Sequence, residues 1–216
     1  MGLAPVTARA WTRARETAAH RGRGGGGGGG VRAARAGARA SASANEREIL
    51  RETTKKIREC AKRGAASAAV DLLVSLNGLG ATPDARATSA TLTACVNGRD
   101  VELARRVYDE IFEKGVAVPD EVAVAEMAKG YLSLDPPSWG QAMSVVNGAK
   151  DRHGIELTSV TYNALLSCCT ATNDLARAEE IVDRMVDEGV APDMWTVSAV
   201  QKRRSIRAYV KKMLLV

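Results

Sequence analysis

Three short segments of this chain end in nearly the same sequence motif, and this recurrence constrains the fold more than any other feature. The copies of this motif are "LGATPD" at 79–84, "KGVAVPD" at 114–120 and "EGVAPD" at 188–193. The glycine is typical of a helix end because it tolerates a positive φ, and the proline prevents the helix from resuming. The same helix end at a nearly constant interval indicates an internal repeat.

Each copy of the motif ends one predicted helix, and a second predicted helix precedes that helix in the sequence. Over 68–84, 103–120 and 177–193 the apolar residues follow helical spacing, and Ala69, Ala104 and Ala178 each lie eleven residues before the glycine. The segments 53–64, 89–100 and 160–174 carry an apolar face and then a turn residue. The sequence therefore predicts four helix–turn–helix units, named units 1 to 4 below, at 50–84, 85–120, 121–158 and 159–193.

Unit 3 departs from the pattern, and the cysteines support the spacing of the others. Unit 3 carries "SLDPPSWGQA" where its turn should be, and Pro136 and Pro137 fit only a widened turn because neither suits a helix interior. Cys60, Cys95 and Cys169 fall at the same place in units 1, 2 and 4. Equivalent places in separate units lie far apart along a stack, so we expect buried packing residues rather than a metal site or a disulfide.

A single helical hairpin of this size cannot bury its own apolar face, but stacked hairpins bury it jointly. The predicted fold class is therefore all-α: a right-handed α-solenoid of about four units plus a partial fifth. The fifth unit begins with "MWTVSAVQ" at 194–201, and the following "KRRSIRAYVKKMLLV" is predicted to contain neither a turn nor a second helix. Residues 194–216 could be a basic cap or a place where the reading frame departs from the true one.

The net charge of +6 is unevenly divided along the chain. Residues 1–44 carry +7, residues 45–193 carry −7 and residues 194–216 carry +6. The basic character thus belongs to the two ends, and the acidic repeat region predicts weak attraction for phosphate. No apolar run reaches the 18 or so residues of a membrane span, so no membrane association is expected.

Residues 1–44 do not read as a folded segment. They are rich in Arg and Ala, contain one acidic residue, and include "GRGGGGGGG" at 22–30, which is expected to be unstructured. This composition is typical of an organelle transit peptide. "VRAARA" at 31–36 resembles a plastid processing site. A plastid is therefore expected, with a mitochondrion as the competing destination and a basic arm that binds nucleic acid as the other interpretation.

The helical hairpin of about 35 residues, with "VTYNALL" and "DLARAEEIVDRMVDEGVAPD" in unit 4, closely resembles the pentatricopeptide repeat family. The resemblance covers residues 50–193; it is strongest in unit 4 and weakest in unit 3. The related tetratricopeptide repeat has a Trp, Gly and Tyr signature that these units lack.

The resemblance implies binding of single-stranded RNA in an organelle, about one base per unit, in RNA processing, stability or translation. In the family the fifth and last residues of a unit read the base. Here they are Thr54 with Asp84, Ser89 with Asp120, Ala125 with Thr158, and Asn163 with Asp193, followed by Ser198 in the partial fifth unit. The family's code implies the order G-G-N-U, with unit 3 permissive because alanine offers no polar group.

The residue that sandwiches the base is the second of each unit, and the family places an apolar side chain there. Val122 and Val160 fit this pattern, whereas Arg51 and Arg86 depart from it and put base clamping by units 1 and 2 in doubt. A structural interpretation competes for Asn163 and Asp193. They could be only a polar residue of a first turn and an N-cap for the next helix.

Other functions find less support in the sequence. We find no spacing of nucleophile and base, no phosphate loop and no paired metal carboxylates, so neither an enzyme nor a cofactor, metal or small-molecule substrate is expected. The main alternative is a scaffold whose concave face holds a protein partner. Three reading units cannot define a unique site in a transcriptome, so we expect partners or a longer array of units.

Overall fold

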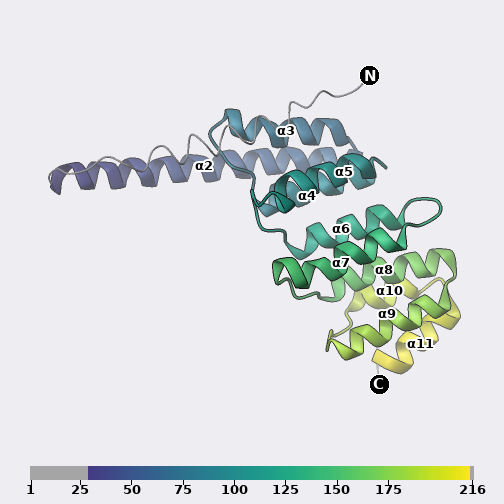
Figure 1. The fold of residues 1–216 in the computed structure, drawn as a ribbon. Coiled ribbons are helices and arrows are strands. Elements are labelled where there is room, and N and C mark those ends of the chain that lie inside the picture. The colour runs from purple at the N-terminus through teal and green to yellow at the C-terminus, as the bar shows by residue number, and fades with distance from the viewer. Residues whose placement is uncertain (1–28, 215–216) are drawn as a thin grey trace.

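The computed structural model describes the backbone of residues 29–214 and the side chains of residues 44–214, and all the regular secondary structure of this part is helical (Figure 1). Its α-helices are labelled from α2, and α5 continues directly into a π-helical turn, η2. The bounds are α2 Gly29–Arg63, α3 Ala66–Gly78, α4 Ala85–Asn97, α5 Val101–Tyr108, η2 Asp109–Glu113, α6 Glu121–Leu132, α7 Trp139–His153, α8 Ser159–Thr172, α9 Leu175–Asp187, α10 Met194–Val200 and α11 Arg204–Leu214.

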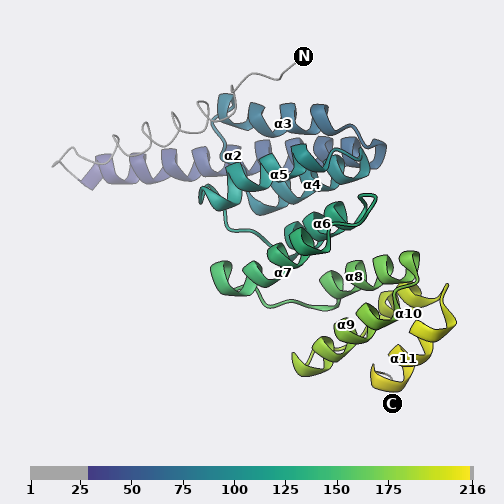
Figure 2. The same cartoon turned by 45° about the vertical axis from the view of Figure 1, so that its right-hand side comes forward.

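Consecutive helices pair into hairpins that match the predicted units. Unit 1 pairs α2 with α3, unit 2 pairs α4 with α5, unit 3 pairs α6 with α7, and unit 4 pairs α8 with α9. The first helices of successive units pack against one another in a continuous row from α2 through α4, α6 and α8 to α10. Figures 1 and 2 show this stack running from α2 and α3 at one end to α11 at the other. The predicted all-α solenoid is confirmed.

The glycine that ends the second helix of each unit forms the hinge to the next unit, as predicted. Gly80, Gly115, Gly154 and Gly189 all adopt a left-handed φ, between 64° and 76°. The last residue of each unit then caps the first helix of the next one. Asp84, Asp120 and Asp193 accept hydrogen bonds of 2.8–2.9 Å from the backbone N–H three residues on. Such a cap contributes about 1 kcal/mol to helix stability.

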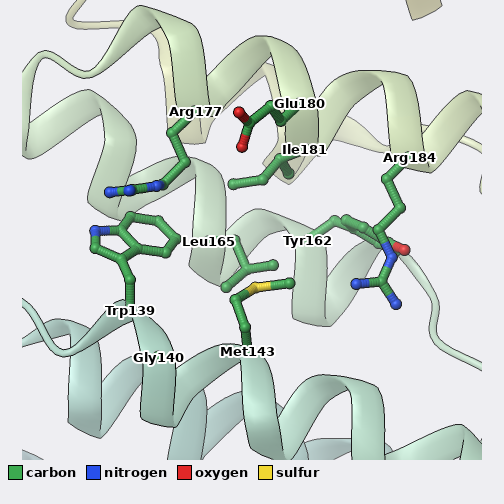
Figure 3. Close-up of a pocket in the computed structure, with 9 residues that line it drawn as sticks. All are labelled: Trp139, Gly140, Met143, Tyr162, Leu165, Arg177, Glu180, Ile181 and Arg184. Atoms are coloured by element: carbon green, nitrogen blue, oxygen red, sulfur yellow. The ribbon is translucent and has the colours of Figure 1, made fainter.

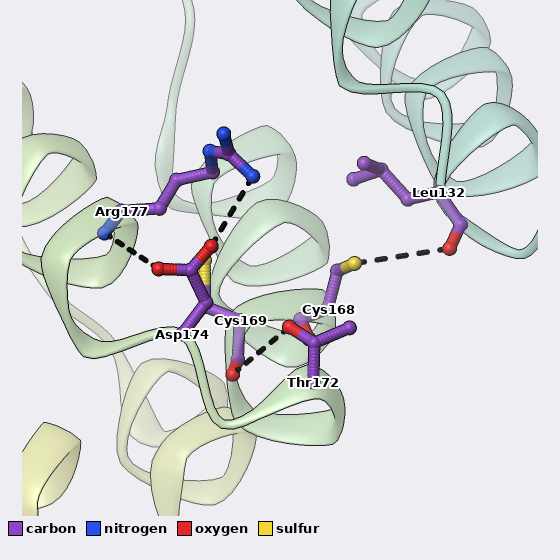
Figure 4. A network of polar contacts seen from close by, with 6 residues as sticks. All are labelled: Leu132, Cys168, Cys169, Thr172, Asp174 and Arg177. Carbon is purple, nitrogen blue, oxygen red and sulfur yellow. Dashed lines mark hydrogen bonds and ion pairs between the residues drawn. The ribbon is translucent and has the colours of Figure 1, made fainter. Parts of the chain in front are cut away.

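The core lies between the first and second helices and along the row of first helices. Ala69, Ala104 and Ala178 are fully buried, so the two helices of a hairpin approach closely there. All four cysteines are free and buried, as expected for packing residues. Figure 4 shows one of them at the contact between units 3 and 4, where the Cys168 thiol donates a weak hydrogen bond of 3.7 Å to the Leu132 carbonyl oxygen.

Helix α2 begins earlier than the sequence predicts. It starts at Gly29, so residues 29–44 are helical rather than unstructured, and this end of α2 projects beyond the stack in Figure 1. The reason is composition: after the glycines the segment is dominated by Ala and Arg, which have high helix propensity. The remainder of the expected transit peptide, residues 1–28, lies outside the described residues.

The prediction that residues 194–216 lack a turn and a second helix is also wrong. Residues 201–203 form the turn, and α11 packs against α9, which completes a fifth hairpin, unit 5. Ile206 and Val210 are buried one helical turn apart, and the Tyr209 hydroxyl donates a 2.8 Å hydrogen bond to Asp183 of α9. Among the described helices, none is long and apolar enough to span a bilayer.

Candidate nucleic-acid interface

The second and fifth residues of every unit lie on the first helices, and we call the surface that these helices present the first-helix face. The second residues are exposed in all five units; they are Arg51, Arg86, Val122, Val160 and Trp195. Val122 and Val160 are each nearly half exposed, which is unusual for valine and places apolar surface where the resemblance expects it.

The fifth residues differ from unit to unit in accessibility. Thr54, Ser89 and Ala125 are buried, with exposed fractions of 7%, 3% and 6%. Asn163 is half-buried and Ser198 is exposed. The C-terminal end of the stack therefore presents its fifth residues to a ligand, whereas the N-terminal end does not.

The structure joins two of the four predicted pairs by a hydrogen bond. The Asn163 amide donates to Asp193 at 3.0 Å, and the Ser89 hydroxyl donates to Asp120 at 2.7 Å. Among the described side chains, no hydrogen bond links Thr54 to Asp84. Thr158 turns to the start of its own unit, where its hydroxyl donates to the Glu121 carboxylate at 2.8 Å.

Asp193 has the most crowded carboxylate of the site. One oxygen accepts from the Asn163 amide, the Thr196 backbone N–H and the Thr196 hydroxyl, and the other accepts from the Ser159 hydroxyl at 2.7 Å. These hydrogen bonds, the one from Ser159 first, lower the pKa of Asp193 to about 2. The carboxylate is therefore a fixed acceptor that caps α10 and at the same time orients the Asn163 amide.

A groove of about 440 Å³ opens between α8 and α10, beside this pair. Asn163 and Ser198 line it together with Trp195, a residue that is 64% exposed. The Asn163 Oδ1 atom is buried and has no hydrogen-bond partner among the described residues. Lys202 adds a cation to the same wall. This α8/α10 groove combines an aromatic surface, an amide and an ammonium group.

The indole and the ammonium group of this groove come from Trp195 and Lys202, which were not predicted as site residues. Trp195 is the second residue of unit 5, so extending the count by one unit past Asp193 would have found it. Lys202 follows the end of α10 at the first turn of the fifth hairpin. It could not have been assigned without knowing that this hairpin has a turn there.

A second groove on the same face, of about 560 Å³, lies between α2 and α4. Arg58 and Lys62 line it from α2, Arg86 and Ser89 line it from α4, and Asp120 and Val122 line it from the start of α6. We call it the α2/α4 groove. It differs from the α8/α10 groove because its walls carry three cations, whereas the other carries an exposed indole, a half-buried amide and one lysine.

Figure 3 shows a third groove, of about 400 Å³, which lies between α7 and α9 on the second helices. The Arg177 guanidinium lies 4.5 Å from the centre of the Trp139 ring and covers one face of that indole. Met143, Leu165 and Ile181 meet in its centre. None of the predicted reading residues lines this groove, so it is separate from the first-helix face.

Charge is segregated between the two layers of helices. Within residues 50–187, the first helices carry eight basic and four acidic side chains, whereas the second helices, η2 included, carry six basic and ten acidic ones. Six of the eight basic side chains of the first helices lie on α2, so the basic surplus of this layer belongs to unit 1. Within the described residues, no cluster of three or more His, Cys, Asp or Glu side chains could hold a metal ion.

Comparison with known proteins relates this architecture to one family. Residues 146–202, from α7 to the turn after α10, match the pentatricopeptide repeat domain. The small ribosomal subunit protein mL103 (rPPR7) of Arabidopsis thaliana is 23% identical over 106 residues, covering 49% of this chain and 25% of that protein. A chloroplastic pentatricopeptide repeat-containing protein of Arabidopsis thaliana is 28% identical over 145 residues, covering 67% of this chain and 15% of that protein.

Solved structures show the same fold. The pentatricopeptide repeat protein PPR10 in complex with an 18-nt psaJ RNA element superposes with a TM-score of 0.62 at 20% identity, over 76% of this chain and 23% of that one. PPR10 from maize gives a TM-score of 0.54 at 18% identity, over 76% of this chain and 25% of that one. The chain thus spans a quarter or less of the length of the proteins it matches.

Proposed function

We propose that this chain, which is a pentatricopeptide repeat protein, binds single-stranded RNA along its first-helix face. The observation that carries this proposal is the α8/α10 groove. There an exposed indole, an oriented amide and a lysine lie side by side. An unstacked base is recognised in proteins by this combination of stacking and edge hydrogen bonds, with a cation for the phosphate.

Base discrimination is assigned to Asn163, and uracil is the expected base there. Asp193 fixes the amide of Asn163, and Val160 and Trp195 are exposed on the same face. One good edge contact discriminates between bases by about 1–3 kcal/mol. The guanine preference expected at units 1 and 2 is weaker than the code implies, because Thr54 and Ser89 are buried.

The relatives support an organelle as the place of action. One of them is named as chloroplastic and another as a ribosomal subunit protein. Together with the Arg-rich N-terminal segment, this supports import into a plastid or a mitochondrion, with the plastid as our proposal. The role we propose there is binding in RNA processing, stability or translation rather than catalysis.

The experiment is binding of the purified full-length chain to fluorescein-labelled RNA of about 12 nucleotides, single-stranded or in a duplex, measured by fluorescence anisotropy at low salt. We expect single strands to bind and the duplex to compete poorly. A chain that binds neither, yet recovers the same protein from an organelle extract before and after RNase treatment, would favour the scaffold function instead. A fluorescent protein fused to the C-terminus of the full chain tests the location, and a diffuse cytosolic signal would contradict it.

A further inference from the structure

We propose that the α2/α4 groove binds the sugar–phosphate backbone of the RNA, so that units 1 and 2 supply affinity without reading bases. This inference rests on the proposed function and deepens it. It divides the first-helix face into an N-terminal part that holds the strand and a C-terminal part that reads it.

Three cations converge on this groove from its two walls. Arg58 and Lys62 are one helical turn apart on α2, and Arg86 faces them from α4. All three side chains are exposed. Guanidinium groups match the geometry of a phosphate with two parallel N–H donors, and an ammonium group adds a point charge. The groove therefore suits a polyanion.

These cations are available to a ligand. Among the described side chains, Arg58 and Arg86 form no ion pair, and Lys62 pairs only with Glu59, at 2.8 Å on an exposed surface. An exposed pair of this kind contributes little, so a phosphate can replace Glu59. Arg51 differs because it contacts both Glu48 and Glu52, and we leave it out of the proposed surface.

The acidic group of the groove is already engaged. The Asp120 carboxylate accepts hydrogen bonds from the Ser89 hydroxyl at 2.7 Å and from the Ala123 backbone N–H at 2.9 Å, through the same oxygen. Its charge is partly compensated by these donors and by the N-terminus of α6. Three cations thus face one carboxylate that is tied to the helix behind it.

The polar group expected to read a base from unit 2 is withdrawn from this groove, and the apolar second-position residue on its wall is Val122 of unit 3. Ser89 is 3% exposed and its hydroxyl proton is directed to Asp120, so it has little left to offer a base edge. The second residue of the unit is Arg86, where unit 5 has Trp195. A contact made through phosphate does not depend on sequence. A strand laid along the row of first helices would meet this surface at one end and the α8/α10 groove at the other.

The test compares two variants of the full chain that remove the same charge. In the groove variant, Arg58, Lys62 and Arg86 are changed to Gln. In the control variant, Arg105, Arg106 and Lys150, which are exposed on α5 and α7, are changed to Gln. The probes are 12-nucleotide single-stranded RNAs that contain GGAU or CCAU, which differ only at the two bases assigned to units 1 and 2, with Kd measured from about 50 to 200 mM salt. Circular dichroism melting confirms that both variants stay folded.

We expect the groove variant to lower the slope of log K against log salt by about 2, which corresponds to three phosphate contacts at about 0.7 each. The groove variant should weaken the affinity for both RNAs by the same factor, and the control variant should keep the wild-type slope. An equal loss of affinity in the control variant would mean that only the net charge of the chain matters, and this would overturn the inference. A changed ratio between the two RNAs would also overturn it, because that result places base reading in this groove.

The inference and the proposed function fail in different ways. If the wild-type chain binds RNA and the groove variant binds it equally well, only the inference is lost. If the wild-type chain binds no RNA, the proposed function is lost. In that case a poly-glutamate peptide that binds the wild type but not the groove variant would assign the groove to an acidic protein segment, which also overturns the inference.

Discussion

The side-chain amide of Asn163 donates a hydrogen bond of 3.0 Å to the carboxylate of Asp193, and this contact joins two residues that are 30 positions apart in the sequence. Asp193 also caps α10, which begins the following unit. The contact therefore links the first helices of units 4 and 5 at the point where their groove opens. The N-cap and the base-reading interpretations of Asp193 are compatible, because one carboxylate caps α10 and also holds the Asn163 amide.

Changing Asn163→Thr should move the preference at the fourth base from uracil to guanine. The amide that we propose meets the uracil edge is lost, and the resemblance to the family implies that Thr with Asp reads guanine. The change is measured as the ratio of Kd values for RNAs that differ only at that base, and about a 5- to 100-fold reversal is within the range of one edge contact. Thr54→Asn, at a buried position, serves as the matched control. An unchanged preference in Asn163→Thr would reject the assignment.

Changing Trp195→Ala should weaken the binding of every single-stranded RNA by about 1–3 kcal/mol, roughly 5- to 150-fold in Kd. The loss should be the same for all sequences because base stacking on an aromatic ring does not depend on sequence. Trp195→Phe should restore most of the affinity. The neighbouring Met194 is 75% exposed and does not line the groove, so Met194→Ala is the control for lost apolar surface. If both alanine variants bind alike, the indole has no stacking role.

Changing Gly98→Ala should destabilise the fold at the contact between units 1 and 2. A Cβ atom at Gly98 would lie 2.5 Å from the Gly64 carbonyl oxygen, so the two turns would have to separate. We expect a loss of about 1–3 kcal/mol in the free energy of unfolding, or about 2–4 °C in Tm for each kcal/mol. Gly140→Ala is the control because nothing lies within 4 Å of its Cβ position. Equal melting temperatures for the two variants would count against the packing of these turns.

The charge of Asp193 should stabilise the fold at neutral pH and lose this effect in acid. Its pKa is lowered to about 2 in the folded state, so its contribution is complete above the ordinary pKa of 3.8 and disappears as the pH falls towards 2. The difference in Tm between the wild type and Asp193→Asn should therefore be constant from pH 7 to about 5 and shrink below about pH 4. A difference that does not vary with pH would mean that the charge is unimportant.

The thiols should be unreactive while the chain is folded. Burial raises the pKa of Cys95 and of Cys169 to about 12, and the reactive form of a thiol is the thiolate. Iodoacetamide at pH 8 should therefore leave both residues unlabelled until a denaturant is added, as read by mass spectrometry of tryptic peptides. Rapid labelling of either residue in the native chain would show that the contact between its helices opens.

The unit boundaries could be predicted from the sequence because they depend on local chemistry. A glycine such as Gly189 takes a positive φ wherever it ends a helix, and Asp193 caps the next helix wherever a helix follows. The fifth hairpin could not be predicted in the same way. Its turn contains neither Gly nor Asn, and the apolar spacing of Ile206 and Val210 is hidden among six basic residues.

The site could be predicted in position but not in accessibility. Counting along the repeat gave the fifth residues, and unit 4 has the expected pair. Whether a fifth residue reaches solvent depends on how closely neighbouring first helices pack, which is why Ser89 is buried and Asn163 is only half-buried. The segregation of charge onto two layers also depends on the stack and is averaged out in the total charge.

The most direct measurement is the affinity of the purified chain for three short single-stranded RNAs that contain GGAU, GGAG or a scrambled sequence, by fluorescence anisotropy at two salt concentrations. The account predicts that GGAU binds more tightly than GGAG by a factor that salt does not change, because the difference comes from one base edge at Asn163. Equal affinities for all three RNAs would contradict base reading by this groove. Absence of binding to any of them at low salt would contradict RNA binding itself.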